Sequence, residues 1–166
     1  EDIAKRAGIS KAAIYLYFPS KVQLLSALIE AKVSPLARSV EMLAAHGRED
    51  PLTALKMVAT VITERLADPR AVAVPRLVVG ISGRFPEIAE QYREQVIEKA
   101  RGALAMLFEA AIANGQIRRV DTDAFVRAFI GSILFEAIWT HVFDGKTALD
   151  DPQSMLQHHF DLLFSR

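Results

Sequence analysis

The stretch that decides the fold is DIAKRAGISKAAIYLYFPSK, residues 2–21. Its first part has helical spacing, and Gly8 follows where a helix must end, because glycine enters the left-handed cap conformation without a steric clash. Ser10 then offers a hydroxyl to the unpaired amides of a second helix, which the pattern extends to Phe18. Two short helices joined by a turn that contains glycine predict a helix-turn-helix motif.

The second helix of this motif has an inner and an outer face. Ile14 and Phe18 lie four residues apart and are predicted to point inward. Small side chains at Ala12 and Ala13 let the outer face approach the floor of a DNA major groove, and Leu16 would meet a thymine methyl group there. The flanks of the helix carry groups that would reach phosphates, namely Lys11, Tyr15, Tyr17 and Lys21. The alternative is that the tyrosines belong to a core and that the lysines are solvated.

The run GISKAAIYLYFPSK resembles the DNA-binding signature of the TetR family of bacterial transcriptional regulators. The shared features are a glycine, a small hydroxyl residue, a lysine, a Tyr-x-Tyr-Phe cluster and a final lysine. The resemblance implies contacts to the DNA backbone from Ser10, Lys11, Tyr15, Tyr17 and Lys21. It places Ala12, Ala13 and Leu16 against the bases. These three side chains depart from the family pattern because they offer no hydrogen bond to a base, so direct readout and DNA shape both stay open as sources of specificity.

The length suits one large or two small domains, and the apolar fraction is ample for a substantial core. The chain has 166 residues, 51% of them hydrophobic, zero formal net charge and no cysteine. A disulfide framework and a thiolate zinc site are therefore excluded, and a reducing cytoplasm is compatible. No signal peptide is visible, and the apolar run 124–143 contains Arg127, Glu136 and His141, which are costly in lipid. We therefore expect a bacterial cytoplasmic protein without a membrane span.

The remainder of the chain is predicted to be helical throughout, which makes the fold class all-α and TetR-like. Residues 1–45 would form the helix-turn-helix head with its connecting helix, and residues 46–166 a helical domain for effector binding and dimerisation. Since TetR-like proteins carry one more helix before the motif, the sequence is expected to lack that helix. The expected helices span 20–33 with a kinked continuation past Pro35 to 45, 51–67, 70–82, 86–114, 122–143 and 153–164. Pro75 either makes the segment 70–82 a moving element or lies in its first turns. A looser resemblance to the family's C-terminal domain covers RLVVGISGRFPEIAEQY, residues 76–92.

The helix predicted over 122–143 is apolar nearly all round and must be buried on two sides. Paired with 153–164, it would form a four-helix bundle across a two-fold axis, and therefore a homodimer. Two heads separated by about 34–36 Å, or a multiple of that distance, would read a palindrome. The predicted interface comprises Phe125, Phe129, Ser132, Ile133, Glu136, Thr140, Met155, His159 and Leu163.

The chain carries no convincing signature of catalysis, of a cofactor or of a metal site. The segment Gly80 to Gly83 is one residue short of a nucleophile elbow. Gly145 to Thr147 mimics the end of a phosphate-binding loop but lacks the earlier glycine. His158 and His159 are adjacent on a predicted helix and cannot chelate one ion together. We therefore predict neither an enzyme nor a cofactor.

The resemblance also implies a small-molecule site in the helical domain, whose occupation releases DNA. The residues predicted to line it, each of which would also fit a plain core, are Met57, Val61, Leu77, Ile81, Phe85, Tyr92, Val96, Trp139, His141 and Phe143. Tyr92, His141 and Arg84 are the candidate polar anchors for a small, mostly apolar effector. The partners expected are thus a double-stranded DNA operator, the effector and a second copy of the chain, and the function is that of a ligand-released repressor. The alternative is a helical small-molecule sensor or interaction module without specific DNA readout.

Overall fold

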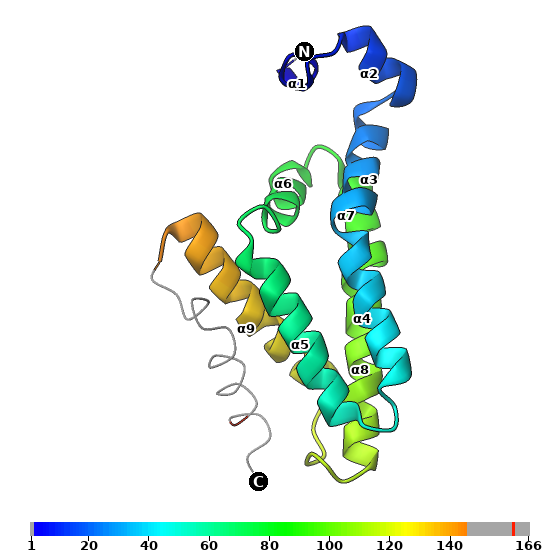
Figure 1. Ribbon diagram of the computed structural model, residues 1–166, viewed down its shortest axis with the longest axis vertical. Helices are drawn as coiled ribbons and strands as arrows, with labels where there is room; N and C mark the ends of the chain where they lie inside the picture. The colour runs from blue at the N-terminus through cyan, green and yellow to red at the C-terminus, as the bar shows by residue number, and fades with distance from the viewer. Residues whose placement is uncertain (1, 146–160, 162–166) are drawn as a thin grey trace.

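The computed structural model describes residues 2–145 and 161, and this part of the chain is helical without strands. The elements in chain order are α1 (Asp2–Ala7), α2 (Lys11–Tyr17), α3 (Lys21–Lys32), α4 (Ser34–His46), α5 (Pro51–Ala67), α6 (Ala73–Ile81), α7 (Pro86–Tyr92), the π-helical segment η1 (Arg93–Ile97), α8 (Glu98–Ala113) and α9 (Thr122–Phe143). Helices α1 and α2 form a small head at one end of α3, and the other helices form the body (Figure 1). The predicted all-α fold is confirmed.

Four helices begin where the sequence places a capping residue. The side chains of Ser10, Ser20, Asp50 and Asp121 each accept a hydrogen bond from the backbone amide three residues further on. These bonds satisfy amides that have no partner inside the helix. Gly8, in the turn between α1 and α2, has a φ of 66°, which is the left-handed conformation predicted there. Helix-start signals therefore position the head and both long body helices α5 and α9.

Three predicted helices are divided or shortened. The segment expected to run from 20 to 45 with a kink is two helices, because α3 ends at Lys32 and α4 begins at Ser34 with Pro35 in its first turn. Residues 86–114 form α7, η1 and α8 in succession, with one wider π-helical turn between the two α-helices. Helix α6 begins at Ala73, so Pro75 lies in its first turn and does not interrupt it. The predicted helix 153–164 lies outside the described residues.

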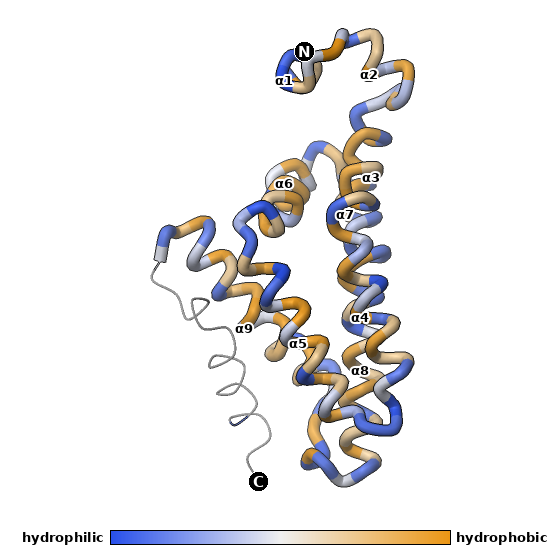
Figure 2. Tube along the Cα trace, in the orientation of Figure 1, coloured by the Kyte–Doolittle hydropathy of each residue, from blue (hydrophilic) through white to orange (hydrophobic). Residues whose placement is uncertain are grey.

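Two clusters of buried apolar side chains hold the body together. The larger one joins α4, α5, α8 and α9 around Phe108, whose ring contacts those of Phe125 and Phe129 edge to face at centroid distances of 4.7 and 5.6 Å. The smaller one joins α3, α6 and α7 and includes Ile29 and Ile88. Figure 2 shows hydrophilic residues in the turns at the far end of the body, and also in the head and beside α6.

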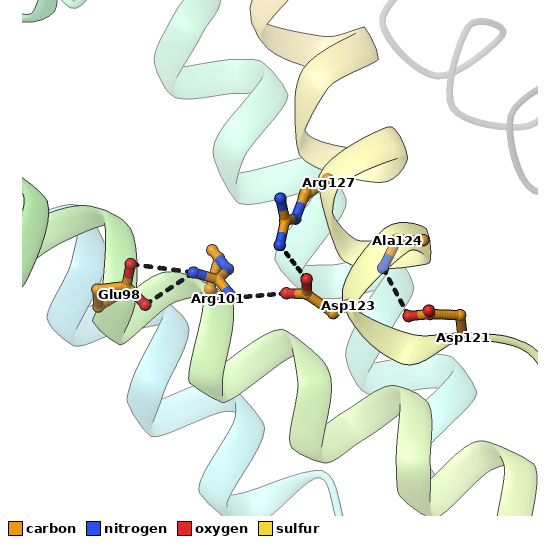
Figure 3. A network of polar contacts seen from close by, with 6 residues as sticks. All are labelled: Glu98, Arg101, Asp121, Asp123, Ala124 and Arg127. Atoms are coloured by element: carbon orange, nitrogen blue, oxygen red, sulfur yellow. Dashed lines mark hydrogen bonds and ion pairs between the residues drawn. The ribbon is translucent and has the colours of Figure 1, made fainter.

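A network of ion pairs fastens the start of α9 to α8 (Figure 3). The Arg101 guanidinium donates to both oxygens of Glu98, at 3.0 and 2.8 Å, and to Asp123 Oδ1 at 2.5 Å. Arg127 donates to the other Asp123 oxygen. These bonds from Arg127 and Arg101 lower the pKa of Asp123 below its ordinary value, so the carboxylate stays charged at neutral pH.

Helix α9 is also, by length and composition alone, the one helix in the described part that could cross a membrane. In addition, α2 and α3 pass the same test as a pair bent by 69°. One side of α9 is nevertheless buried in the body through Val126, Phe129, Ile133 and Ala137. This side of α9 therefore packs against other helices of the same chain, and the opposite side is accessible.

Candidate DNA-binding surface and ligand cavity

Helix α2 presents the predicted DNA-reading residues on an exposed surface. Leu16 and Tyr17 are 79% and 76% exposed, and Tyr15 is about half exposed. Ile14 and Phe18 are partly buried on the inner side. This matches the division into an inner and an outer face that the helical spacing predicts. Large apolar and aromatic side chains are therefore available to a partner at the far end of the head.

The other predicted DNA-binding residues surround this surface. Ser10, Lys11, Ala12 and Lys21 are exposed, whereas Ala13 is partly buried. The Lys11 ammonium lies 6.0 Å from the centre of the Tyr15 ring. The Ser10 hydroxyl oxygen accepts a hydrogen bond from the Ala13 backbone amide at 3.0 Å. Since a hydroxyl has one proton and a second lone pair left, Ser10 can cap α2 and still donate to a phosphate.

The body contains an apolar cavity of about 450 Å³ that lies between the two buried clusters. Its wall is drawn from α3, α4, α5, α6, α7, η1, α8 and α9 and from the segment before α6. The apolar lining residues include Leu36, Val40, Ile62, Leu66, Val78, Val96, Ile130 and Leu134, and the polar ones are Lys32, Arg65, Ser82 and Tyr92. Burial raises the pKa of Tyr92 to about 12, so its phenol is neutral at physiological pH. The size and the lining are those of a small-molecule site.

Two of the ten residues predicted to line an effector site, Tyr92 and Val96, border this cavity. Leu77 borders an adjoining cavity of about 480 Å³ that shares Lys32, Arg65 and Ala71 with the first. Ile81 and Phe85 pack against the smaller cluster. The candidate anchor Arg84 has its guanidinium over the Phe85 ring, at 5.7 Å.

The five remaining residues lie elsewhere on α5 and α9. Met57, Trp139 and Phe143 have largely exposed side chains, and Val61 is partly buried. The His141 ring hydrogen-bonds through Nε2 to the Leu66 carbonyl at 3.0 Å, which ties the end of α9 to the end of α5. The structure thus brings part of the predicted set together and distributes the rest over the surface and the core.

Sequence reasoning missed Lys32 and Arg65, which are the charged residues of the cavity wall. Each lies in the last turn of its helix, α3 and α5 respectively. Basic residues are common there because they interact favourably with the negative end of the helix dipole. A basic residue in the last turn of an apolar helix is the one sequence signal that both residues give. Because the helix dipole alone accounts for this signal, it does not indicate a cavity.

The accessible face of α9 differs from the face predicted to meet a partner chain. Phe129 and Ile133 are 1% and 0% exposed and belong to the core of their own chain, so their predicted place in a dimer interface is corrected. Phe125, Ser132, Glu136 and Thr140 are partly buried. Met155, His159 and Leu163 lie outside the described residues.

Three exposed aromatic side chains of α9, spaced four residues apart, form a stripe: Phe135, Trp139 and Phe143. Phe135 and Phe143 are 59% and 66% exposed. The Trp139 ring stacks on Phe135 at a centroid distance of 6.3 Å and lies 6.4 Å from Phe143. We call these three residues the aromatic stripe. Such a run of exposed aromatic side chains is typical of a surface that a partner covers.

A helix-turn-helix with an exposed second helix, carried on a helical body, defines the class of helix-turn-helix DNA-binding proteins. Residues 1–28 match the sequence profile of the tetR family of bacterial regulatory proteins. Residues 53–158 match the profile of the AefR-like transcriptional repressor C-terminal domain. The chain belongs to the TetR family of bacterial transcriptional regulators.

A solved structure agrees with this assignment at the level of the fold. The crystal structure of a TetR-family transcriptional regulator from Mesorhizobium loti superimposes with a TM-score of 0.73 and 20% sequence identity. The match covers 98% of this chain and 84% of that one. No curated protein sequence matches the chain significantly.

Proposed function

We propose that this TetR-family protein is a ligand-released repressor that binds a palindromic operator as a homodimer. The observation that carries the proposal is the placement of the cavity. Its wall includes Lys32 and Val33 at the end of α3 and Leu36 at the start of α4. Helix α3 is also the element that connects the head to the body (Figure 1). A ligand in the cavity therefore touches the support of the head directly.

At the DNA, α2 enters the major groove with Ala12, Ala13 and Leu16 toward the bases. The phosphate contacts come from Ser10, Lys11, Tyr15, Tyr17 and Lys21. The exposure of the outer side of α2 supports these roles, because none of the described helices of the body covers it. The protein acts in the cytoplasm, where the operator is.

The homodimer forms through the accessible side of α9. The aromatic stripe supplies apolar surface for a second copy of the chain, and a two-fold axis brings the same stripe from each copy together. Dimerisation sets the distance between the two heads, and a ligand that moves α3 changes that distance. The mostly apolar lining of the cavity supports a mostly apolar effector.

The test is a selection of bound fragments from genomic DNA with the full-length protein. We expect enrichment of a palindromic sequence whose half-sites lie one helical turn, or a multiple of it, apart. The binding should survive competitor DNA at physiological salt, since sequence-specific contacts add to the electrostatic ones. Recovery of fragments without a common sequence would instead support the alternative of a helical sensor without specific DNA readout.

A further inference from the structure

The charged residues of the cavity wall are of one sign. Among the described residues that line the 450 Å³ cavity, Lys32 and Arg65 are charged and no carboxylate is present. Both also line the adjoining 480 Å³ cavity, where Arg70 adds a third cation and Asp68 a single anion. The wall that the two cavities share therefore carries two cations, Lys32 and Arg65.

The present partners of Arg65 hold it weakly. Its Nη2 lies 3.4 Å from the Lys32 carbonyl oxygen, and its Nη1 lies 4.0 Å from Asp68 Oδ2. Asp68 is more closely engaged by Arg70, which donates to Asp68 Oδ1 from its backbone amide at 2.9 Å and from its side chain at 3.2 Å. A guanidinium has five N–H donors in a planar fork, so Arg65 can accept an anion without breaking a strong bond.

We propose that the cavity binds an organic anion with an apolar body, and that Arg65 and Lys32 bind its charged group. This inference rests on the ligand-binding site of the proposed function and names the chemical class of the ligand. The body of the ligand lies against apolar residues such as Val40, Ile62 and Leu134. Its carboxylate or phosphate receives charge-assisted hydrogen bonds at the boundary between the two cavities.

The charge of this shared wall selects against the other ligand classes. A neutral ligand of the same shape would cover the two cations without replacing their water, which is unfavourable. A cationic ligand would meet like charges on entering. An anion removes both costs, and the second cavity leaves room for an anionic group larger than a carboxylate.

The same contact would link the ligand to the head. Lys32 is the last residue of α3, and its carbonyl already accepts from Arg65. An anion that binds the Arg65 guanidinium competes with the Lys32 carbonyl for its N–H donors, at the junction between α3 and α4. The ligand thus acts on the hinge that carries the head, which is the differential contact that allosteric release of DNA requires.

The experiment measures ligand binding to the full-length protein by isothermal titration calorimetry, without DNA. The probes are a decyl chain and a naphthalene ring, each carrying a carboxylate, a trimethylammonium or a hydroxyl group, all below any critical micelle concentration. We expect at least one carboxylate to bind about tenfold or more tightly than its matched alcohol. Arg65→Gln and Lys32→Gln should each remove most of this preference and leave the alcohol within about twofold. Arg119→Gln, which removes an exposed arginine outside the cavity wall, is the matched control and should keep it.

The outcomes separate this inference from the proposed function. Equal or tighter binding of the alcohol or the ammonium compound would overturn the anionic class while keeping the cavity as a ligand site. Retention of the carboxylate preference in both variants would overturn the assignment of Arg65 and Lys32. Absence of binding by every probe would also overturn the inference, whereas the repressor function is decided separately by the DNA selection.

Discussion

At the scale of single residues, α2 combines charged and apolar groups with different tasks. Lys11 is the first residue of α2 and Lys21 the first residue of α3, whereas Leu16 is the most exposed large apolar residue on the outer side of α2. Phosphate contacts supply affinity that does not depend on sequence, and contacts to base edges supply discrimination. The two kinds of residue should therefore respond differently to substitution.

Replacement of Lys21 by alanine should weaken binding to all DNA sequences by a similar factor, because it removes one phosphate contact. The slope of log K against log salt should fall by about 1. Fluorescence anisotropy on operator and random duplexes over a salt series measures both quantities. Lys99→Ala on α8, outside the head, is the control and should change neither. A change in sequence preference with unaltered affinity for the operator would contradict the phosphate role.

Replacement of Leu16 by alanine should instead change sequence preference. The loss of an apolar contact with a thymine methyl is worth roughly 1 kcal/mol, or about fivefold in affinity at that base pair. Operator variants with uracil in place of thymine, which lack only the methyl group, provide the comparison. The Leu16 variant should no longer distinguish them from the parent operator. If it still did, the methyl contact would belong to another residue.

At the scale of the elements, helix ends and helix contacts determine how the head and the body are built. The turn between α1 and α2 needs a left-handed residue, and the start of α9 needs the Arg101–Asp123 pair. Both features are local in sequence or in space, and each can be removed by one substitution.

Gly8→Ala should destabilise the head by about 1–2 kcal/mol, because alanine is strained at a φ of 66°. An added Cβ at Gly8 would meet no atom within 4 Å, so the effect is conformational and not steric. Gly102→Ala, within α8 and equally without a neighbour, should stabilise the chain by roughly 0.5–1 kcal/mol. Hydrogen exchange in α1 and α2, together with denaturant unfolding of the body, distinguishes the two effects. If Gly8→Ala left the stability of the head unchanged, the turn would have relaxed to another conformation.

Asp123→Asn should lower Tm at neutral pH, because it removes the carboxylate that joins Arg101 and Arg127. The pKa of Asp123 is lowered in the folded state, so its contribution is present at neutral pH and is lost as the pH falls through the folded pKa. The difference in Tm between the natural protein and the variant should therefore shrink below about pH 4. Thermal melting between pH 7 and pH 3 measures it. A difference that stays constant over this range would show that the effect does not come from the charge.

At the scale of the whole molecule, the proposed homodimer uses the accessible side of α9. The aromatic stripe consists of three exposed aromatic side chains on α9, and α9 lies on the body, away from α2 (Figure 1). A dimer formed there keeps the reading surfaces of both heads available to DNA.

Phe135→Glu should convert the dimer into a monomer at micromolar concentration, because each copy would bury a carboxylate without a partner. Light scattering after size-exclusion chromatography gives the mass, and operator binding should fall with it. Met57→Glu, at a comparably exposed apolar position on α5, is the control and should leave the mass unchanged. A dimer that persists in the Phe135 variant would place the interface on another surface.

Much of this architecture follows from the sequence because its signals are local. A capping side chain, a glycine with positive φ or a proline in a first turn acts within three or four residues, so the helix starts at Lys11, Lys21, Pro51 and Thr122 were predictable. The same locality made the motif GISKAAIYLYFPSK sufficient to identify the head and the family.

The buried face of α9 and the composition of the cavity were decided only by the tertiary structure. A helix that is apolar all round carries no pattern that selects its inward side, so packing against α5 and α8 decided that Phe129 is buried and Phe135 accessible. Lys32 and Arg65 are 33 positions apart and meet because the ends of α3 and α5 converge. Local signals in the sequence determined most helix starts, the head and the class of protein, whereas the packing of distant helices decided which residues line the cavity and which side of α9 is accessible.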